Sequence, residues 1–271
     1  MKKSPFEQPL IESDAIEALS ARLLTTTTRL LQANFELQKV QDERSEMLAN
    51  ISHDLRAPIT AIRSAVDYLL SGRNLSAEDY QSSLQLINRR TKTLEDLIQD
   101  MYYLFCIEDT SKALNFEVVN VAAFLEEYFY DAIVDTRYDN HNMHLEIEDG
   151  LDCTIEIDIQ KIVRVLDNLF TNAAKYSEAG TDIVLKAEMD AARAQIRISV
   201  TDNGPGIPAE AVKQIFNRTY TVSSARTPNS STGSGLGLSI VKAIMERHDG
   251  TVSCESVVGE GSTFSLAFPT I

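Results

Sequence analysis

Residues 50–63 read Asn-Ile-Ser-His-Asp-Leu-Arg-Ala-Pro-Ile-Thr-Ala-Ile-Arg, which places His53 beside Asp54 on an amphipathic helix. His53 lies two residues from both Ile51 and Leu55, which belong to the apolar stripe of that helix. At about 100° per residue, its ring points almost opposite the stripe. We therefore expect the imidazole to face solvent. His53 could act as a nucleophile or, more simply, be an ordinary surface histidine.

The segment before this stretch predicts a long helix. From Ile16 to Ile51 the apolar residues alternate by three and four, a heptad pattern with three weak members. One amphipathic helix lying on a core would explain the pattern, but a stripe this narrow and long favours a parallel coiled coil. The pattern shifts phase beside Pro58, where a helix can bend.

A second helix follows a predicted turn at residues 71–75. Ser76 and Asp79 have the spacing of a capping box, and apolar residues recur from Tyr80 to Leu104. The two helices predict a hairpin, and a dimer of hairpins makes a four-helix bundle. Residues 108–115 have the composition of a linker.

From about residue 116 the pattern becomes mixed α/β. We expect helices at about 120–136, 158–176, 208–216 and 236–248, and strands at 145–148, 153–157, 183–188, 195–201, 252–256 and 263–268. Because helices and strands do not simply alternate, a doubly wound fold is not favoured.

The composition excludes several classes of function. The chain has 271 residues, 44% of them hydrophobic, and a formal net charge of −15. Such an acidic chain argues against nucleic acid or anionic lipid as the main partner. Three widely spaced cysteines argue against a disulfide framework or a zinc site and favour a reducing compartment. We expect neither a membrane segment in this chain nor a secretory signal.

Three polar residues share one face of the helix expected at 158–176. They are Asn168, Asn172 and Lys175, and the apolar residues line the opposite face. An Asn oxygen is a ligand for Mg²⁺, and a Lys supplies positive charge to a phosphate. An ordinary polar helix face is the alternative.

Two glycine-rich segments follow. Asp202-Asn-Gly-Pro-Gly-Ile ends a strand, so its backbone permits close approach and its carboxylate could accept from an adenine amino group. A plain turn is the alternative. Gly233-Ser-Gly-Leu-Gly-Leu opens a helix, as a phosphate cradle does, although it lacks the P-loop Lys. Residues 219–232 between them suit a mobile lid or a plain flexible loop.

These segments, in this order, resemble the sensor histidine kinases of two-component signalling over about residues 40–271. Residues 52–58 resemble the phosphoacceptor box, and 168–175 the asparagine box. Residues 202–206 resemble the first glycine box, 215–220 the phenylalanine box and 233–238 the second glycine box.

The resemblance implies a fold of class α + α/β. A coiled-coil and helical-hairpin dimerisation domain would precede a Bergerat-type α/β sandwich related to gyrase-like ATPases. The expected boundaries are an N-terminal coiled-coil helix at 1–46, a dimerisation and histidine phosphotransfer domain at 47–107, a linker at 108–115 and a catalytic ATP-binding domain at 116–271.

The resemblance also implies residue roles. His53 would be the phosphoacceptor and Asp54 its acid/base partner. Asn172 would bind Mg²⁺, with Asn168 and Lys175 near the phosphates. Asp202 would bind adenine. Further nucleotide-binding positions would be Gly204, Gly206, Arg218 near the γ-phosphate, Gly233, Gly235 and Gly237.

The activity implied is that of an ATP-dependent protein histidine kinase. It would autophosphorylate on His53 as a homodimer, using ATP and Mg²⁺, and transfer the phosphoryl group to an aspartate of a response regulator receiver domain. A non-catalytic nucleotide-binding scaffold is the alternative, and the hairpin disfavours a gyrase-like ATPase. The expected location is the cytoplasm, either as a soluble protein or as the cytoplasmic part of a membrane-bound sensor.

Two positions depart from the family pattern. Ala57 stands where the family commonly has Thr or Asn, and Thr219 stands where an aromatic residue usually follows the Arg of the phenylalanine box. The remaining histidines, His141, His144 and His248, lie outside the motifs, and we expect them at the surface.

Overall fold

The computed structural model describes most of the chain and divides it into two compact units, residues 1–53 and 54–271. The described residues are 8–71, 75–109, 111–190, 194–217, 220 and 235–270. Among the helices in these ranges, none contains a stretch that is both long enough and apolar enough to cross a lipid bilayer.

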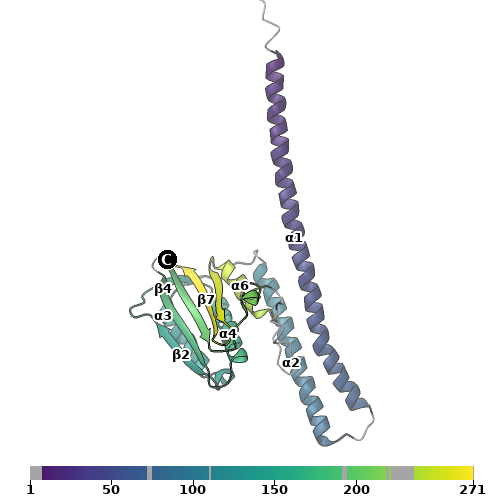
Figure 1. The fold of residues 1–271 in the computed structure, drawn as a ribbon, viewed down its shortest axis with the longest axis vertical. Helices are drawn as coiled ribbons and strands as arrows, with labels where there is room; N and C mark the ends of the chain where they lie inside the picture. Colours follow the sequence, from purple (N-terminus) through teal and green to yellow (C-terminus); the bar gives the residue numbers. More distant parts are fainter. Residues whose placement is uncertain are drawn as a thin grey trace, which may run out of the picture. The chain divides into compact units, whose positions relative to one another are not determined.

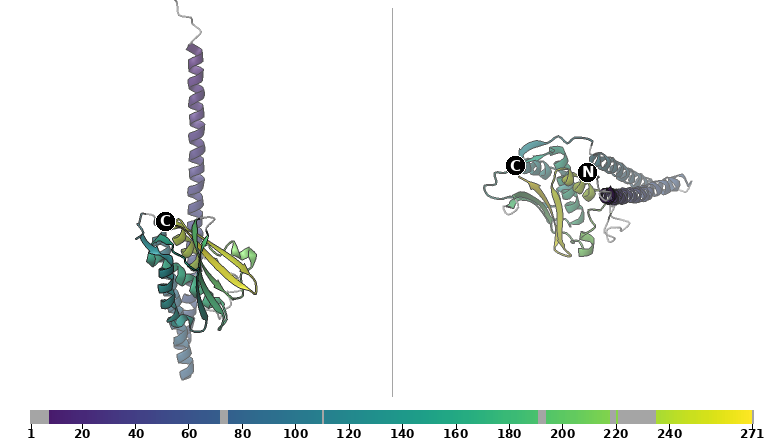
Figure 2. Two further views of the ribbon diagram at one scale, coloured as in Figure 1. Left: turned by 90° about the vertical axis from the view of Figure 1, so that its left-hand side faces the viewer. Right: turned by 90° about the horizontal axis from the view of Figure 1, so that it is seen from above.

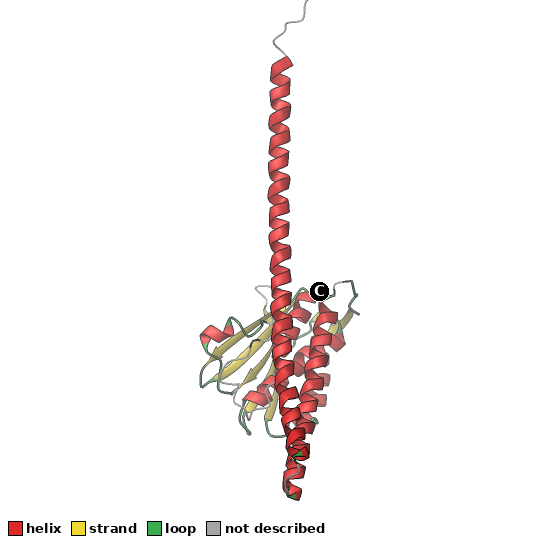
Figure 3. Ribbon diagram, turned by 90° about the vertical axis from the view of Figure 1, so that its right-hand side faces the viewer, coloured by secondary structure: helices red, strands yellow, loops and turns green. Residues whose placement is uncertain are grey.

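The long helix expected near the N-terminus is present. Helix α1 (Gln8–Leu70) runs without a break through Pro58 (Figure 3). Apolar side chains of the heptad stripe, such as Leu23, Leu30 and Leu37, are more than half exposed. A helix with such an apolar stripe gains most of its stability from packing against a partner. The coiled coil itself stays a prediction.

Helix α2 (Ala77–Glu108) begins with the predicted capping box. The backbone N–H of Asp79 donates to Ser76 Oγ at 3.1 Å, and the Asp79 carboxylate accepts from the Ser76 N–H at 2.9 Å. Apolar side chains on both hairpin helices remain substantially exposed, namely Ile59, Val66, Tyr80 and Leu84.

The α/β part is built on a five-stranded mixed sheet in the order β2-β4-β5-β7-β6 (Figure 1). Strand β2 pairs parallel with β4, and the other neighbours are antiparallel. A separate two-stranded antiparallel sheet joins β1 to β3. The strands are β1 (Glu117–Asn120), β2 (Asn142–Ile147), β3 (Thr154–Ile157), β4 (Asp182–Asp190), β5 (Gln195–Asp202), β6 (Thr251–Val257) and β7 (Gly261–Pro269).

Helices cover one face of the large sheet (Figures 1 and 2). Inward residues of the central strands, such as Ile183 and Ile198, are fully buried, whereas Lys186 and Arg197 on the other face are partly exposed. This alternation follows from the period of two in a strand with one covered face. The helical elements are α3 (Val121–Ile133), the 3₁₀ turn η1 (Thr136–Tyr138), α4 (Ile159–Tyr176), α5 (Ala209–Val212) and α6 (Gly237–Arg247).

Two elements differ from the sequence prediction. The sequence did not predict strand β1, which pairs only with β3. Its four residues are too few to show a long alternating pattern. The helix expected at 208–216 is only the short α5, followed by turns at residues 213–216. Every other expected helix and strand of the α/β part is present, with ends shifted by a few residues.

Candidate nucleotide site and phosphoacceptor helix

Helix α4 presents the three polar residues that the sequence placed on one face. Its N-cap is Asp158, whose carboxylate accepts from the Lys161 N–H at 3.2 Å. The opposite face is fully buried against the sheet through residues that include Ile162, Leu166 and Leu169. Asn168, Asn172 and Lys175 are each half-buried, so they line the edge of the packed core.

The asparagine helix and the second glycine segment lie side by side. A Cβ built on Gly237, the first residue of α6, would lie 3.5 Å from Asn168 Oδ1. The Nδ2 of Asn168 is buried and finds no hydrogen-bond partner among the described residues. A buried N–H group normally has a partner, so this position suits a polar ligand.

Asp202 occupies the end of β5 and is only 7% exposed. Burial raises the pKa of its carboxyl group, against the opposing effect of backbone hydrogen bonds from Gly204 and Ser262. The Gly204 N–H donates to Asp202 Oδ1 at 2.8 Å. This buried carboxylate lies in a region of low dielectric, where a hydrogen bond that it accepts from a ligand is electrostatically stronger than in water.

The first glycine segment packs closely on its surroundings. A Cβ on Gly204 would lie 2.7 Å from Asp202 Oδ1 and 3.1 Å from Ser177 Oγ, so this loop meets the end of α4. Gly206 has φ of +69°, and a Cβ there would lie 2.1 Å from the carbonyl oxygen of Val257. Gly206 therefore requires glycine, whereas a Cβ on Gly204 would force the Asp202 carboxylate to shift.

The turn between β6 and β7 also belongs to the site, and sequence reasoning missed it. Ser262 pairs with Asp202 in the sheet register and donates a backbone hydrogen bond to its carboxylate. Ser256 Oγ accepts from the Ile207 N–H at 2.8 Å and donates to the Gly261 carbonyl at 2.7 Å. The only sequence signal was the Gly-Glu-Gly turn between two predicted strands.

Lys175 stands in the last turn of α4. Burial lowers the pKa of its ammonium group, and its Nζ lies 4.9 Å from the ring centroid of Tyr176. A cation that has lost part of its hydration interacts more strongly with an anionic ligand. This environment fits the phosphate-binding role implied for Lys175.

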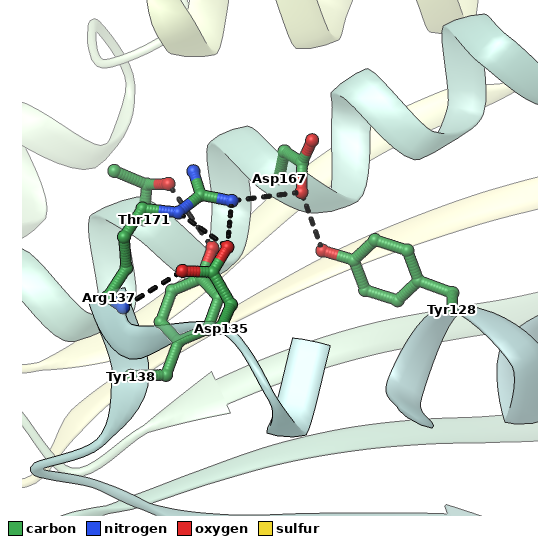
Figure 4. A network of polar contacts seen from close by, with 6 residues as sticks. All are labelled: Tyr128, Asp135, Arg137, Tyr138, Asp167 and Thr171. Carbon is green, nitrogen blue, oxygen red and sulfur yellow. Dashed lines mark hydrogen bonds and ion pairs between the residues drawn. The ribbon is translucent and has the colours of Figure 1, made fainter. Parts of the chain in front are cut away.

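A polar network on the neighbouring flank supports α4 (Figure 4). Tyr128 Oη donates to Asp167 Oδ1 at 3.2 Å, and Arg137 pairs with Asp135 at 2.6 Å. The hydroxyl groups of Tyr138 and Thr171 are 3.4 Å apart. Because Asp167 and Thr171 directly precede Asn168 and Asn172, these contacts from α3 and η1 restrict rotation of the asparagine helix.

The phosphoacceptor candidate lies on α1. His53 is exposed, as its place opposite the apolar stripe predicts, and Asp54 is half-buried. Ala57, one turn further along, is also exposed. Two implied nucleotide-binding residues, Arg218 and Gly233, lie outside the described residues, whereas Gly235 is described and has φ of +66°.

The remaining histidines were expected at the surface, which is wrong for His248. Its side chain is 5% exposed, Nε2 accepts from the Asp158 N–H at 3.0 Å, and Nδ1 lies 2.8 Å from the Ile244 carbonyl. The Nε2 atom therefore carries no proton, and burial lowers the pKa of His248 in agreement with this. His141 is half-buried, with both ring nitrogens buried, and His144 is exposed as expected.

Comparison with known proteins gives two matching family models. The "His Kinase A (phospho-acceptor) domain" matches residues 43–110. The "Histidine kinase-, DNA gyrase B-, and HSP90-like ATPase" model matches residues 157–271, which hold α4 and both described glycine segments. The chain belongs to the sensor histidine kinases.

Curated relatives of this chain agree with the family assignment. Sensor histidine kinase WalK of Bacillus subtilis is 32% identical over 237 residues, which are 86% of this chain and 38% of the relative. Sensor protein kinase WalK of Staphylococcus aureus is 32% identical over 240 residues, 86% of this chain and 55% of the relative. The chain thus spans less than two thirds of the length of these relatives.

Solved histidine kinases share the fold of this chain. Histidine kinase ThkA, in a crystal structure with the response regulator protein TrrA, has a TM-score of 0.65 and 25% identity, covering 83% of this chain and 61% of that one. Full-length ShkA in complex with AMPPNP has a TM-score of 0.58 and 25% identity, covering 83% and 46%. The expected fold, a helical hairpin followed by an α/β ATPase-type domain, is confirmed.

Proposed function

We propose that this kinase transfers the γ-phosphoryl group of ATP to His53 and then passes it to an aspartate of a response regulator receiver domain. One observation carries the proposal: the buried side-chain amide of Asn168, which finds no hydrogen-bond partner among the described residues, lies beside Gly237 at the glycine-rich start of α6. The ShkA structure contains AMPPNP, which supports ATP as the nucleotide, and the ThkA structure contains the response regulator TrrA, which supports a response regulator as the acceptor.

Adenine and phosphates would bind at different ends of this site. The Asp202 carboxylate accepts from the adenine amino group, in an environment that already raises the pKa of that carboxyl group. Asn168 Nδ2 and Lys175 Nζ donate to phosphate oxygens. Glycine at the start of α6 leaves backbone N–H groups open to an anion at the positive end of a helix.

Mg²⁺ fits the site as a companion of the nucleotide. Within the ranges that the structure describes, no group of three or more His, Cys, Asp or Glu side chains could hold a metal ion. The Asn172 side-chain oxygen would therefore hold the ion together with phosphate oxygens. Bound there, the ion would neutralise charge on the phosphates.

The exposed imidazole supplies the nucleophile. A neutral ring nitrogen of His53 attacks the γ-phosphorus, the bond to the bridging oxygen breaks, and ADP leaves. The proton on the other ring nitrogen is held by Asp54, which orients the ring and offsets its developing positive charge. The same phosphorus–nitrogen bond then breaks when an aspartate oxygen of the receiver attacks.

We propose that the functional unit is a homodimer. The exposed stripe of α1 fits a parallel coiled coil, and the exposed apolar residues of the hairpin fit a four-helix bundle with a second copy. Domain boundaries at 46, 107 and 115 remain part of this proposal. All three cysteines are free thiols, which agrees with a cytoplasmic location. The chain would then be a cytoplasmic protein or the cytoplasmic part of a longer, membrane-bound sensor.

A nucleotide-binding scaffold without catalysis is the competing function. Incubation with ATP labelled in the γ-phosphate separates the two. A kinase gives protein-bound label that is stable in base and lost in acid, as expected for phosphohistidine. Binding of AMPPNP without any such label would overturn the proposed kinase reaction and support the scaffold.

A further inference from the structure

Ser177 ends helix α4 and carries a buried hydroxyl group. Its backbone N–H donates to the Ala173 carbonyl at 3.0 Å, so the backbone alone closes the last turn of the helix. The side-chain Oγ is shielded from solvent and completes no hydrogen bond with any residue that the structure describes. Because a buried hydroxyl group normally has a partner, this one is available to a neighbouring acceptor.

The Asp202 carboxylate lies beside this hydroxyl group. Both side chains lie against Gly204, since a Cβ built there would be 2.7 Å from Asp202 Oδ1 and 3.1 Å from Ser177 Oγ. Burial is the main influence on the pKa of Asp202 and raises it, whereas the Ser177 hydroxyl group lowers it. A hydroxyl group lowers the pKa of a carboxyl group by stabilising the ionised form.

Three described groups stabilise the ionised form of Asp202. They are the backbone N–H groups of Gly204 and Ser262 and the hydroxyl group of Ser177. Only the last of these three belongs to a side chain, so it can be removed by substitution without changing the backbone donors. A carboxylate has about four acceptor positions, which leaves a place for the amino group of a ligand.

Ser177 follows the helix that carries the residues expected to meet the phosphates. Lys175 and Asn172 precede it by two and five residues. A hydrogen bond from Ser177 would therefore hold the Asp202 carboxylate at a set position relative to these two residues. A nucleotide requires this, because its adenine and its phosphates are parts of one molecule. Since the Ser177 Oγ is shielded from solvent, it acts on the nucleotide only through the carboxylate.

We propose that Ser177 is a positioning residue for adenine recognition, whose hydroxyl group donates to the Asp202 carboxylate and turns it toward the 6-amino group of the nucleotide. The inference rests on the proposed function, in which Asp202 accepts from that amino group. The two side chains need only rotate about their own bonds to complete the hydrogen bond. Without the hydroxyl group the carboxylate stays in place but is held in one orientation less firmly, so its contact with the amino group weakens.

The test uses two ligands that differ only at this amino group. ADP carries it, purine riboside 5′-diphosphate has a hydrogen atom in its place, and neither can phosphorylate His53. Titration calorimetry gives the dissociation constants of both ligands for the wild type, Ser177→Ala and Ser177→Cys. The Cys variant keeps a side chain of similar shape with a much weaker donor. Ser253→Ala is the matched control, because Ser253 is an exposed serine on β6.

The wild type should bind ADP more tightly than the analogue. Ser177→Ala should weaken ADP binding at least about threefold, because the loss of one hydrogen bond shifts an equilibrium severalfold. The analogue should bind this variant within about twofold of the wild type, since it has no amino group for the carboxylate to meet. Ser177→Cys should change in the same direction, and Ser253→Ala should match the wild type for both ligands.

The two ligands separate positioning from a structural defect. An equal loss of affinity for both ligands in Ser177→Ala and Ser177→Cys would show general damage to the site and overturn the inference. Unchanged ADP affinity in both variants would show that the hydroxyl group has no part in recognition, and would also overturn it. Either result leaves the proposed function standing if the wild type still prefers ADP.

Failure of the proposed function looks different, because it is seen in the wild type. If the wild type binds the analogue as tightly as ADP, the adenine contact of Asp202 is wrong and the inference falls with it. If the wild type binds neither ligand, nucleotide binding itself is wrong, and the proposed function and the inference are both overturned.

Discussion

Replacing Asp202 by Asn should have opposite effects on nucleotide binding and on stability. The carboxylate is 7% exposed and accepts from the Gly204 N–H at 2.8 Å. An Asn oxygen can still accept this bond, so the loop should keep its shape. What the substitution removes is the negative charge that the adenine amino group would meet.

The loss of binding can be estimated from the type of hydrogen bond. A hydrogen bond to a charged group contributes about 1.5–3 kcal/mol, so Asp202→Asn should weaken AMPPNP binding roughly 10- to 150-fold. The same reasoning predicts weaker binding by the wild type as the pH falls, because burial raises the pKa of Asp202 and protonation then begins at a higher pH than for an ordinary Asp.

Stability should change in the other direction. A raised pKa means that the folded state favours the protonated carboxyl group, which stabilises it below the ordinary pKa of 3.8. That stabilisation is lost as the pH rises through the folded-state pKa, so at pH 7 the ionised carboxylate is a burden. The ligand-free Asp202→Asn variant should therefore melt at the same or a higher temperature.

Titration calorimetry with AMPPNP and thermal melting without ligand test both parts. Asp131→Asn, at an exposed carboxyl group on α3, is the matched control and should change neither quantity. Wild-type affinity in Asp202→Asn would refute the adenine contact. A large fall in melting temperature together with weaker binding would show that the substitution disrupts the fold, which would refute our reasoning that it removes only the charge.

Three further predictions concern pH, assembly and regulation. Because burial lowers the pKa of His248, the unfolded state binds the proton more readily, and the free energy of unfolding should fall below pH 6.5 by up to about 1.4 kcal/mol per pH unit; denaturant melts of His248→Gln should show a smaller fall. Light scattering at micromolar concentration should give a dimer mass, and replacing the exposed Leu23 and Leu30 by Asn should weaken the dimer, whereas a monomeric wild type would contradict the coiled coil. Ala57 cannot hold a water by hydrogen bond one turn from His53, so the wild type should dephosphorylate its phospho-regulator little faster than the regulator's own rate, and Ala57→Thr should gain this activity.

Local periodicity predicted the parts of the site that lie within one element. Asn168, Asn172 and Lys175 share a helix face because three- and four-residue spacing determines it, whatever packs there. Asp202 was identifiable because a buried strand ends in a carboxylate followed by glycines. The exposure of His53 followed from its angle to the apolar stripe.

Contacts between distant segments could not be predicted in this way. Ser262 reaches Asp202 through the register of two strands, and Arg247 reaches the Ile107 carbonyl across 140 residues. We expected His248 at the surface because its hydrogen-bond partner is the backbone N–H of Asp158. Every residue except proline has such a group, so no pattern of side chains in the sequence indicates this contact. Such contacts depend on the tertiary fold, and a single sequence does not specify which pairs meet.

The central claim is that His53 accepts the phosphoryl group from nucleotide bound at the Asp202 site. The most direct measurement is mass spectrometry of the chain after incubation with ATP and Mg²⁺, under conditions that preserve phosphohistidine, for the wild type and His53→Gln. We expect phosphate on His53 in the wild type and none in His53→Gln, which should still bind AMPPNP with wild-type affinity. Acid-labile phosphate on His53→Gln, or on another histidine of the wild type, would contradict it.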